Sequence, residues 1–110
     1  MPDEWGIYWI DLGVPYGHEQ GGPRPAIITR NVHGICIVIP LTTNADDLSR
    51  FSHTLQISST VATRLSTNSV ALIFQIRAID QTRVKSKIGE LESHQIFSIK
   101  AEMKSMFAIA

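Results

Sequence analysis

The alternation of apolar and polar positions predicts a series of short strands followed by one helix. Apolar, β-branched and aromatic residues dominate three early segments, residues 6–12, 25–29 and 35–41, and this composition is typical of strands. The second and third segments are separated by Arg30-Asn31-Val32-His33-Gly34, whose Asn and Gly favour a turn between antiparallel strands. The sequence therefore predicts a hairpin of two largely buried strands.

The middle of the chain is predicted to consist of polar connections around one short strand. Residues 42–47 are polar and leave the sheet as a loop, whereas residues 53–57 alternate and predict a shorter strand. Residues 58–68 are polar again, and their composition predicts irregular structure with at most one helical turn.

The last third of the chain predicts two more strands and a terminal helix. Residues 69–80 form the longest strand candidate, and their alternation places Gln75 and Arg77 on one face. Residues 84–89 predict a last strand, and a helix begins near residue 93, where apolar residues recur at helical spacing. The apolar stripe of this helix consists of Ile96, Ile99, Met103, Met106 and Phe107. Strands followed by one helix predict the α+β class, as a small antiparallel β-barrel or curled sheet.

Length and composition predict one globular domain over residues 1–110. Apolar residues make up 44% of the chain, and 10 Lys and Arg balance 10 Asp and Glu, which excludes a disordered chain and a polybasic tail. No apolar run approaches the roughly 18 residues of a membrane span. The chain starts with Met1-Pro2-Asp3-Glu4, which is the opposite of a basic secretory start. We therefore expect a cytoplasmic protein.

The cysteine and the histidines do not predict a metal or redox site. Cys36 lies within Ile35-Cys36-Ile37-Val38-Ile39, so we expect it to be a small buried core residue and not a reactive thiolate. The chain has four histidines without ligand spacing, namely His18, His33, His53 and His94. We therefore expect no metal and no cofactor.

A glycine-rich segment between the first two strands carries most of the candidate chemistry. It reads Gly17-His18-Glu19-Gln20-Gly21-Gly22-Pro23-Arg24-Pro25. The glycines allow a close approach to a ligand, and two prolines restrict the backbone on either side of Arg24. A guanidinium held in this way can donate two hydrogen bonds to a phosphate.

Four blocks in consistent order resemble the MazF/PemK family of toxins. They are residues 6–12, 17–26, 39–44 and 69–80, and together they span most of the chain. The resemblance implies a dimeric SH3-like barrel of the CcdB/PemK type with a terminal helix. It also implies a ribosome-independent, sequence-specific endoribonuclease for single-stranded RNA, usually mRNA, that is inhibited by a cognate MazE-like antitoxin.

The resemblance also implies roles for individual residues. Arg24 and Thr42 match the family's active-site arginine and threonine, and Glu19 matches the glutamate of its Glu-Gln-Gly loop. His18 stands where a serine is common in the family. Candidate RNA contacts within these blocks or on the following strand are Gln20, Thr43, Asn44, Gln75, Arg77 and Lys85.

The chemistry of RNA cleavage leaves the proton acceptor open. A metal-free reaction uses the ribose 2′-hydroxyl as nucleophile, leaves a 2′,3′-cyclic phosphate and a 5′-hydroxyl, and needs a base and donors for the charged phosphorane. Arg24 and Thr42 can supply donors, but an arginine is a poor proton acceptor. Either Glu19 or His18 could be the base, and the pKa of a free histidine suits neutral pH.

Two further questions remain open at the level of sequence. Arg77, Lys85 and Lys87 could form a basic strip for the RNA backbone or an ordinary solvated face. Tyr16 and Trp5 could stack on bases, although Trp5 fits better as a packing residue at the end of the barrel. The alternative function is a non-catalytic, CcdB-like module that binds a protein such as gyrase. The cleaved RNA motif and the identity of the antitoxin do not follow from the sequence.

Overall fold

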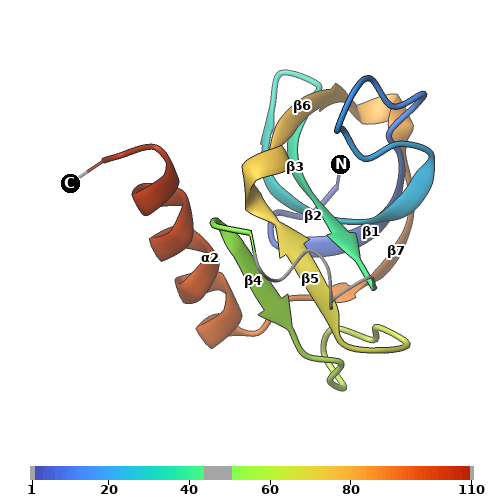
Figure 1. The fold of residues 1–110 in the computed structure, drawn as a ribbon. Helices are drawn as coiled ribbons and strands as arrows, with labels where there is room; N and C mark the ends of the chain where they lie inside the picture. Colours follow the sequence, from blue (N-terminus) through green and yellow to red (C-terminus); the bar gives the residue numbers. More distant parts are fainter. Residues whose placement is uncertain (1, 44–50, 110) are drawn as a thin grey trace.

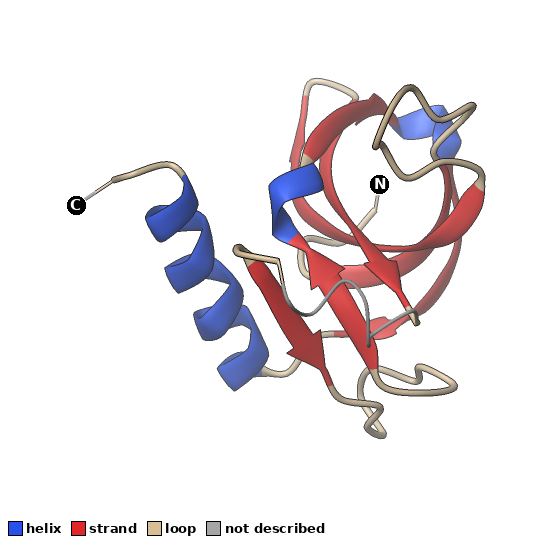
Figure 2. Ribbon diagram, viewed as in Figure 1, coloured by secondary structure: helices blue, strands red, loops and turns tan. Residues whose placement is uncertain are grey.

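The computed structural model describes residues 2–43 and 51–109, in which one antiparallel sheet is accompanied by a helix (Figures 1 and 2). Among these residues the sheet order is β4-β5-β3-β2-β1-β7, and β6 also pairs with β3. The strands are β1 (Gly6–Asp11), β2 (Pro23–Val32), β3 (Ile35–Thr42), β4 (Thr54–Ile57), β5 (Ser69–Leu72), β6 (Arg77–Asp80) and β7 (Val84–Glu90). The sheet curls into a barrel, and α2 (Ser93–Met106) runs alongside β4 (Figure 1). The predicted α+β barrel with a terminal helix is confirmed.

The central strands are apolar on both faces because each face covers a different core. Ala26 and Ile28 of β2 belong to the core inside the barrel, together with Ile10 of β1. Ile27, between them, belongs to the core beneath α2, where it joins the buried Ile99 of the helix. Alternate residues of a strand point to opposite faces, so a strand between two cores has a continuous apolar sequence.

The predicted hairpin is confirmed, but its turn is shorter than expected. Only His33 and Gly34 form the turn, and both have positive φ, 52° and 80°, as a two-residue type I′ turn requires. Arg30 to Val32 extend β2 with mostly exposed side chains, and the pairing register shifts between Ile28 and Arg30. Polar residues at a sheet surface therefore resembled a turn in the sequence.

The prediction of a single strand over residues 69–80 is wrong. The segment forms β5, a 3₁₀ turn at Ile73–Gln75 and then β6. β3 explains the break, because β5 pairs with its end at Leu41 and Thr42, whereas β6 pairs with its beginning. The two halves of this apolar run therefore pair with different parts of β3.

Several smaller predictions are confirmed. Cys36 is buried in the barrel core, and burial raises the pKa of its thiol. Trp5 packs against the core beneath α2, and Lys100 lies 5.6 Å from the centre of its ring. Residues 58–68 are irregular.

No helix among the described residues is long and apolar enough to cross a membrane.

Candidate active site

A hollow opens where β2 and β3 diverge, and we call it the fork hollow. The two strands are paired as far as Ala26 and Pro40. Beyond this pair, β3 continues alongside β5 through Leu41 and Thr42, while residues 23–25 of β2 continue alongside β1. Proline has no N–H group to donate, so the prolines at positions 23, 25 and 40 favour this separation. The hollow has a volume of about 520 Å³.

Part of the lining of the fork hollow is polar and positively charged. Its polar lining residues are Arg24, Thr42, Thr43, Arg64, Ser66 and Ser69. The Nε–H of Arg24 donates to the carbonyl of Gly21 at 3.2 Å, and partial burial lowers the pKa of the guanidinium. Among the described residues neither arginine forms an ion pair. Two positive charges are therefore available to an anion.

The rest of the lining of the fork hollow is apolar and includes Trp9, Leu65 and Ile88. Trp9 lies opposite Pro25 in the pairing of β1 with β2, and 45% of its surface is exposed. The hollow thus combines cations and hydroxyl groups with an exposed aromatic ring.

Arg64 was not predicted from the sequence, and its position depends on a hydrogen-bonded turn. The N–H of Arg64 donates to the carbonyl of Thr60 at 3.0 Å, and the backbone of Arg64 has a φ of 55°. The hydroxyl of Thr63 accepts from the N–H of Thr60 at 2.8 Å and donates to the carbonyl of Ser58 at 3.1 Å. The N–H of Glu90 in β7 donates to the Ala62 carbonyl at 2.9 Å. No sequence pattern links this turn to Arg24.

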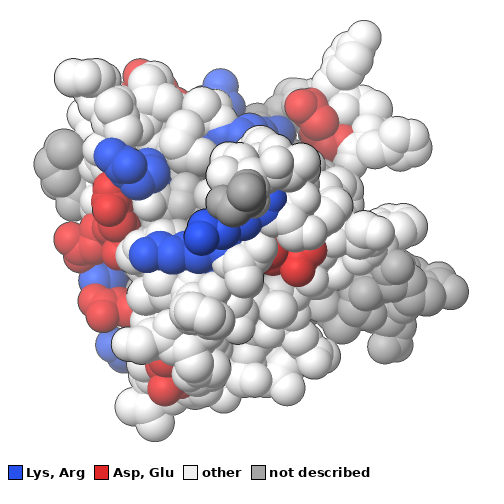
Figure 3. Space-filling view, turned by 90° about the vertical axis from the view of Figure 1, so that its left-hand side faces the viewer, with Lys and Arg blue, Asp and Glu red and all other residues white. Residues whose placement is uncertain are grey.

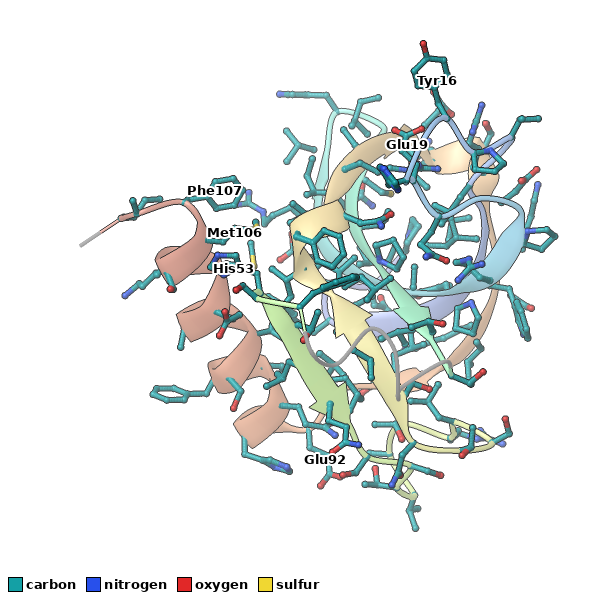
Figure 4. All side chains as sticks on the ribbon, in the orientation of Figure 1. Tyr16, Glu19, His53, Glu92, Met106 and Phe107 are labelled. Carbon is teal, nitrogen blue, oxygen red and sulfur yellow. The ribbon has the colours of Figure 1, made fainter. Side chains whose placement is uncertain are left out.

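His18 and Glu19 do not line the fork hollow. They line a second hollow of about 300 Å³ together with Gln75 and Arg77. Glu19 Oε1 accepts from the N–H of Tyr16 at 3.0 Å, and Glu19 Oε2 lies 3.9 Å from a guanidinium nitrogen of Arg77. Figure 4 shows Glu19 on the glycine-rich loop at one end of the barrel, with Tyr16 projecting into solvent. The structure thus separates two of the predicted catalytic candidates from Arg24 and Thr42.

Gln75 and Arg77 hold the glycine-rich loop in place. Gln75 Oε1 accepts from the N–H of Gln20 at 2.7 Å, and Gln75 Nε2 donates to the carbonyl of His18 at 2.9 Å. Arg77 donates to the carbonyls of Gln20 and Leu12. Although the two residues do not share one strand, both therefore contact the loop whose Gly21 accepts from Arg24.

The remaining candidate RNA contacts are dispersed. Thr43 lines the fork hollow, whereas Asn44 lies outside the described residues. Lys85 lines a different hollow and donates to the carbonyl of Thr82 at 3.1 Å.

The proposed basic strip does not form a row of free charges, because Lys87 is paired with two carboxylates. Its Nζ lies 2.7 Å from Glu90 and 2.9 Å from Asp3. Hydrogen bonds to Glu90 and Asp3 raise the pKa of Lys87. The hydrogen bond between Lys87 and Asp3 also lowers the pKa of Asp3. Lys87 is therefore already neutralised by its neighbours.

Possible metal ligands are not clustered in the part of the chain that the structure describes. Among residues 2–43 and 51–109, no three His, Cys, Asp or Glu side chains are clustered closely enough to bind a metal ion. The lining of the fork hollow instead offers cations and hydroxyl groups, which suit an anionic ligand.

Comparison with known proteins assigns the fold and the family. A protein named "Endoribonuclease MazF" from Staphylococcus epidermidis is 28% identical over 97 residues, covering 84% of this chain and 80% of the relative. The crystal structure of MazF from Deinococcus radiodurans matches with a TM-score of 0.80 at 21% identity, over 98% of this chain and 97% of that one. A MazE–MazF crystal structure from the same organism matches with a TM-score of 0.73 at 22% identity, over 99% and 97%.

The family model covers almost the whole chain. It describes the PemK-like, MazF-like toxin of type II toxin–antitoxin systems, and it matches residues 3–107. The match includes every element of the described barrel, the fork hollow and the hollow lined by His18 and Glu19. The chain therefore belongs to the family of PemK-like, MazF-like toxins of type II toxin–antitoxin systems.

Proposed function

We propose that this protein is the toxin of a toxin–antitoxin module and a sequence-specific, ribosome-independent endoribonuclease that cuts single-stranded RNA, mRNA in particular. The observation that carries the proposal is the fork hollow, whose lining brings together Arg24, Thr42 and Arg64. The name of the Staphylococcus epidermidis relative supports the same activity. Because mRNA is present in the cytoplasm, the proposed substrate supports a cytoplasmic location for the protein.

The reaction follows from the chemistry of the ribose. The 2′-hydroxyl attacks the adjacent phosphorus, the bond from phosphorus to the 5′-oxygen breaks, and a 2′,3′-cyclic phosphate and a 5′-hydroxyl result. Arg24 donates to the phosphate oxygens and stabilises the additional charge of the phosphorane. The hydroxyl of Thr42 donates to the same phosphate, and Arg64 adds a second positive charge. No step requires a bound metal ion.

We assign the role of proton acceptor to water and not to a residue that lines the fork hollow. This lining contains no carboxylate and no imidazole among the described residues. Partial burial lowers the pKa of Arg24, but an arginine remains a poor base. We therefore assign phosphate binding to Arg24. The hollow is open to solvent, and water carries the 2′-hydroxyl proton away and returns one to the leaving 5′-oxygen.

The partners of the protein belong to the same proposal. The protein forms a homodimer and binds a MazE-like antitoxin that blocks its RNA site. The MazE–MazF crystal structure of Deinococcus radiodurans, which resembles this fold, supports such a partner. Light scattering at micromolar concentration should give the mass of a dimer, and a monomer mass would contradict this part of the proposal.

The first experiment is RNA cleavage in the presence of EDTA. Purified protein is incubated with a long single-stranded RNA, and the ends of the products are mapped. We expect discrete cuts with 5′-hydroxyl ends, and Arg24→Ala should slow cleavage about 100- to 1,000-fold because it removes a donor to the developing charge. Thr42→Ala should also slow cleavage strongly. Arg30→Ala is the matched control, because Arg30 lies on the same strand but pairs with Glu4 at the surface.

Each other outcome has a defined meaning. Intact RNA would contradict the proposed activity and favour the non-catalytic alternative, a CcdB-like module that binds a protein such as gyrase. Cleavage only after addition of a divalent metal would contradict the metal-free reaction. Equal losses in Arg24→Ala and Arg30→Ala would place the active site elsewhere.

A further inference from the structure

Trp9 is held with its side chain exposed beside the proposed phosphate site. Its neighbours in β1, Tyr8 and Ile10, are buried at 7% and 0% exposure, whereas Trp9 is 45% exposed. Backbone pairing with Pro25 fixes its position on the sheet. Among the exposed large hydrophobic residues of the described chain, Trp9 is the one that lines the fork hollow.

Trp5, the other tryptophan, has a packing role and serves as a comparison for Trp9. Trp5 packs against the core beneath α2 and has the Lys100 ammonium over its ring at 5.6 Å. For Trp9, no aromatic or cation contact to the ring occurs within the described residues. An exposed indole face that lacks such a neighbour is open to a flat aromatic ligand.

The lining of the fork hollow suits the two parts of a nucleotide. Arg24 and Arg64 match a phosphate, whereas Trp9 and Ile88 match a base. We propose that Trp9 is a stacking platform for an RNA base next to the phosphate held by the two arginines. This inference rests on the proposed function and adds a base-binding subsite to it.

Stacking on Trp9 has a defined signature. Every base has an aromatic face, so stacking tolerates different sequences and contributes to affinity without reading hydrogen-bonding groups. The loss of one aromatic platform should weaken binding about tenfold or more. Trp9 should therefore matter for any RNA with bases, and not for a chain of phosphates alone.

The test uses probes that cannot be cleaved through the 2′-hydroxyl. One probe is a 2′-O-methyl RNA oligonucleotide of mixed sequence, and the second is an abasic oligonucleotide of the same length. In the Trp5→Phe variant, Trp9 is the only tryptophan. We expect its fluorescence to be quenched, with saturation, by the first probe but not by the abasic probe. The Trp9→Phe variant, which keeps Trp5, should show no change with either probe.

Affinities measured by fluorescence anisotropy complete the test. Trp9→Ala should bind the base-containing probe about tenfold or more weakly, whereas Trp9→Phe, which keeps an aromatic face, should stay within about threefold of the wild type. Neither change should alter binding of the abasic probe. Thermal melting of both variants shows that they are folded.

The outcomes separate this inference from the proposed function. Equal weakening of both probes by Trp9→Ala, or equal quenching by both, would overturn stacking. RNA cleavage that depends on Arg24 would still support the proposed function in that case. Failure of the wild-type protein to bind either probe or to cleave RNA would overturn both proposals.

Discussion

Residue types alone identified only part of the candidate site. Arg24 and Thr42 stand out in the sequence through the family resemblance, and both line the fork hollow. Arg64 and Trp9 line it as well, but an arginine in a polar segment and an aromatic residue in a strand are common in any globular chain. His18 and Glu19 stand close to Arg24 in sequence and still line another hollow.

The position of His18 leads to a prediction about the pH dependence of cleavage. His18 lies outside the lining of the fork hollow, so His18→Gln should leave both the rate, within about threefold, and the shape of the pH–rate profile unchanged. Single-turnover rates between about pH 5 and pH 9 measure both quantities. If the variant loses the acidic limb of the profile, His18 is the base after all and the loop must move toward the phosphate.

At the level of elements, the glycine-rich loop depends on two residues that follow β5. Gln75 makes two hydrogen bonds to the loop backbone, at Gln20 and His18. Arg77 makes two more, one to the carbonyl of Gln20 within the loop and one to the carbonyl of Leu12, which precedes the loop. Because Arg24 also contacts this loop through Gly21, the loop links the two hollows.

Removal of the Gln75 amide should loosen the loop without unfolding the barrel. Each lost hydrogen bond is worth about 0.5–1.5 kcal/mol, so Gln75→Ala should speed amide hydrogen exchange at Gln20 by about 10- to 100-fold. Gln81→Ala is the matched control, because it removes the same amide group from an exposed residue outside the hollow lined by His18 and Glu19. Unchanged exchange at Gln20 would contradict a role of Gln75 in holding the loop.

The turn that carries Arg64 is supported by a glycine in β7. A Cβ atom at Gly89 would lie 2.6 Å from the Ala62 carbonyl oxygen and closer still to that of Thr63. Only glycine therefore allows the turn to lie against the strand.

The change Gly89→Ala should displace the turn. We expect the free energy of unfolding to fall by about 1–3 kcal/mol through overpacking, and RNA affinity to fall because Arg64 moves. Urea denaturation and anisotropy titrations measure the two effects. Ser86→Ala, at an exposed position of the same strand, should change the free energy of unfolding by less than about 0.5 kcal/mol. A Gly89→Ala variant as stable as the wild type would show that the turn is not fixed to β7.

At the scale of the whole molecule, the protein has no net charge to attract RNA over a distance. Ten basic residues balance ten acidic ones, and on the face formed by α2 the two signs lie side by side (Figure 3). Attraction to RNA therefore comes from local groups, above all the two arginines of the fork hollow.

This distribution of charge predicts a shallow dependence of RNA binding on salt. Two neutralised phosphates give a slope of about −1.4 for log K against log salt concentration, and Arg64→Ala should reduce it to about −0.7. Titrations of an uncleavable oligonucleotide between about 50 and 200 mM salt measure the slope. Lys85→Ala is the control, because Lys85 lines another hollow, and a steep wild-type slope would indicate a wider basic surface.

The sequence by itself determined the class of fold, the hairpin, the terminal helix and the family. These features depend on local periodicity and on the order of residue blocks along the chain, and both can be read from the sequence alone. It also supplied Arg24 and Thr42 as candidates. It did not show that residues 69–80 break into two strands, because that break comes from β3 changing partners along its length.

Only the tertiary structure decided which candidates come together. The fork hollow exists because β3 leaves β2 after Pro40 to pair with β5, and this separation brings Trp9, Arg24, Thr42 and Arg64 around one space. These residues are distant in sequence, and no local pattern relates them. Pairing between strands and packing against β7 set the distances between these residues. The composition of the site therefore follows from long-range contacts, which cannot be read from the spacing of residues along the chain.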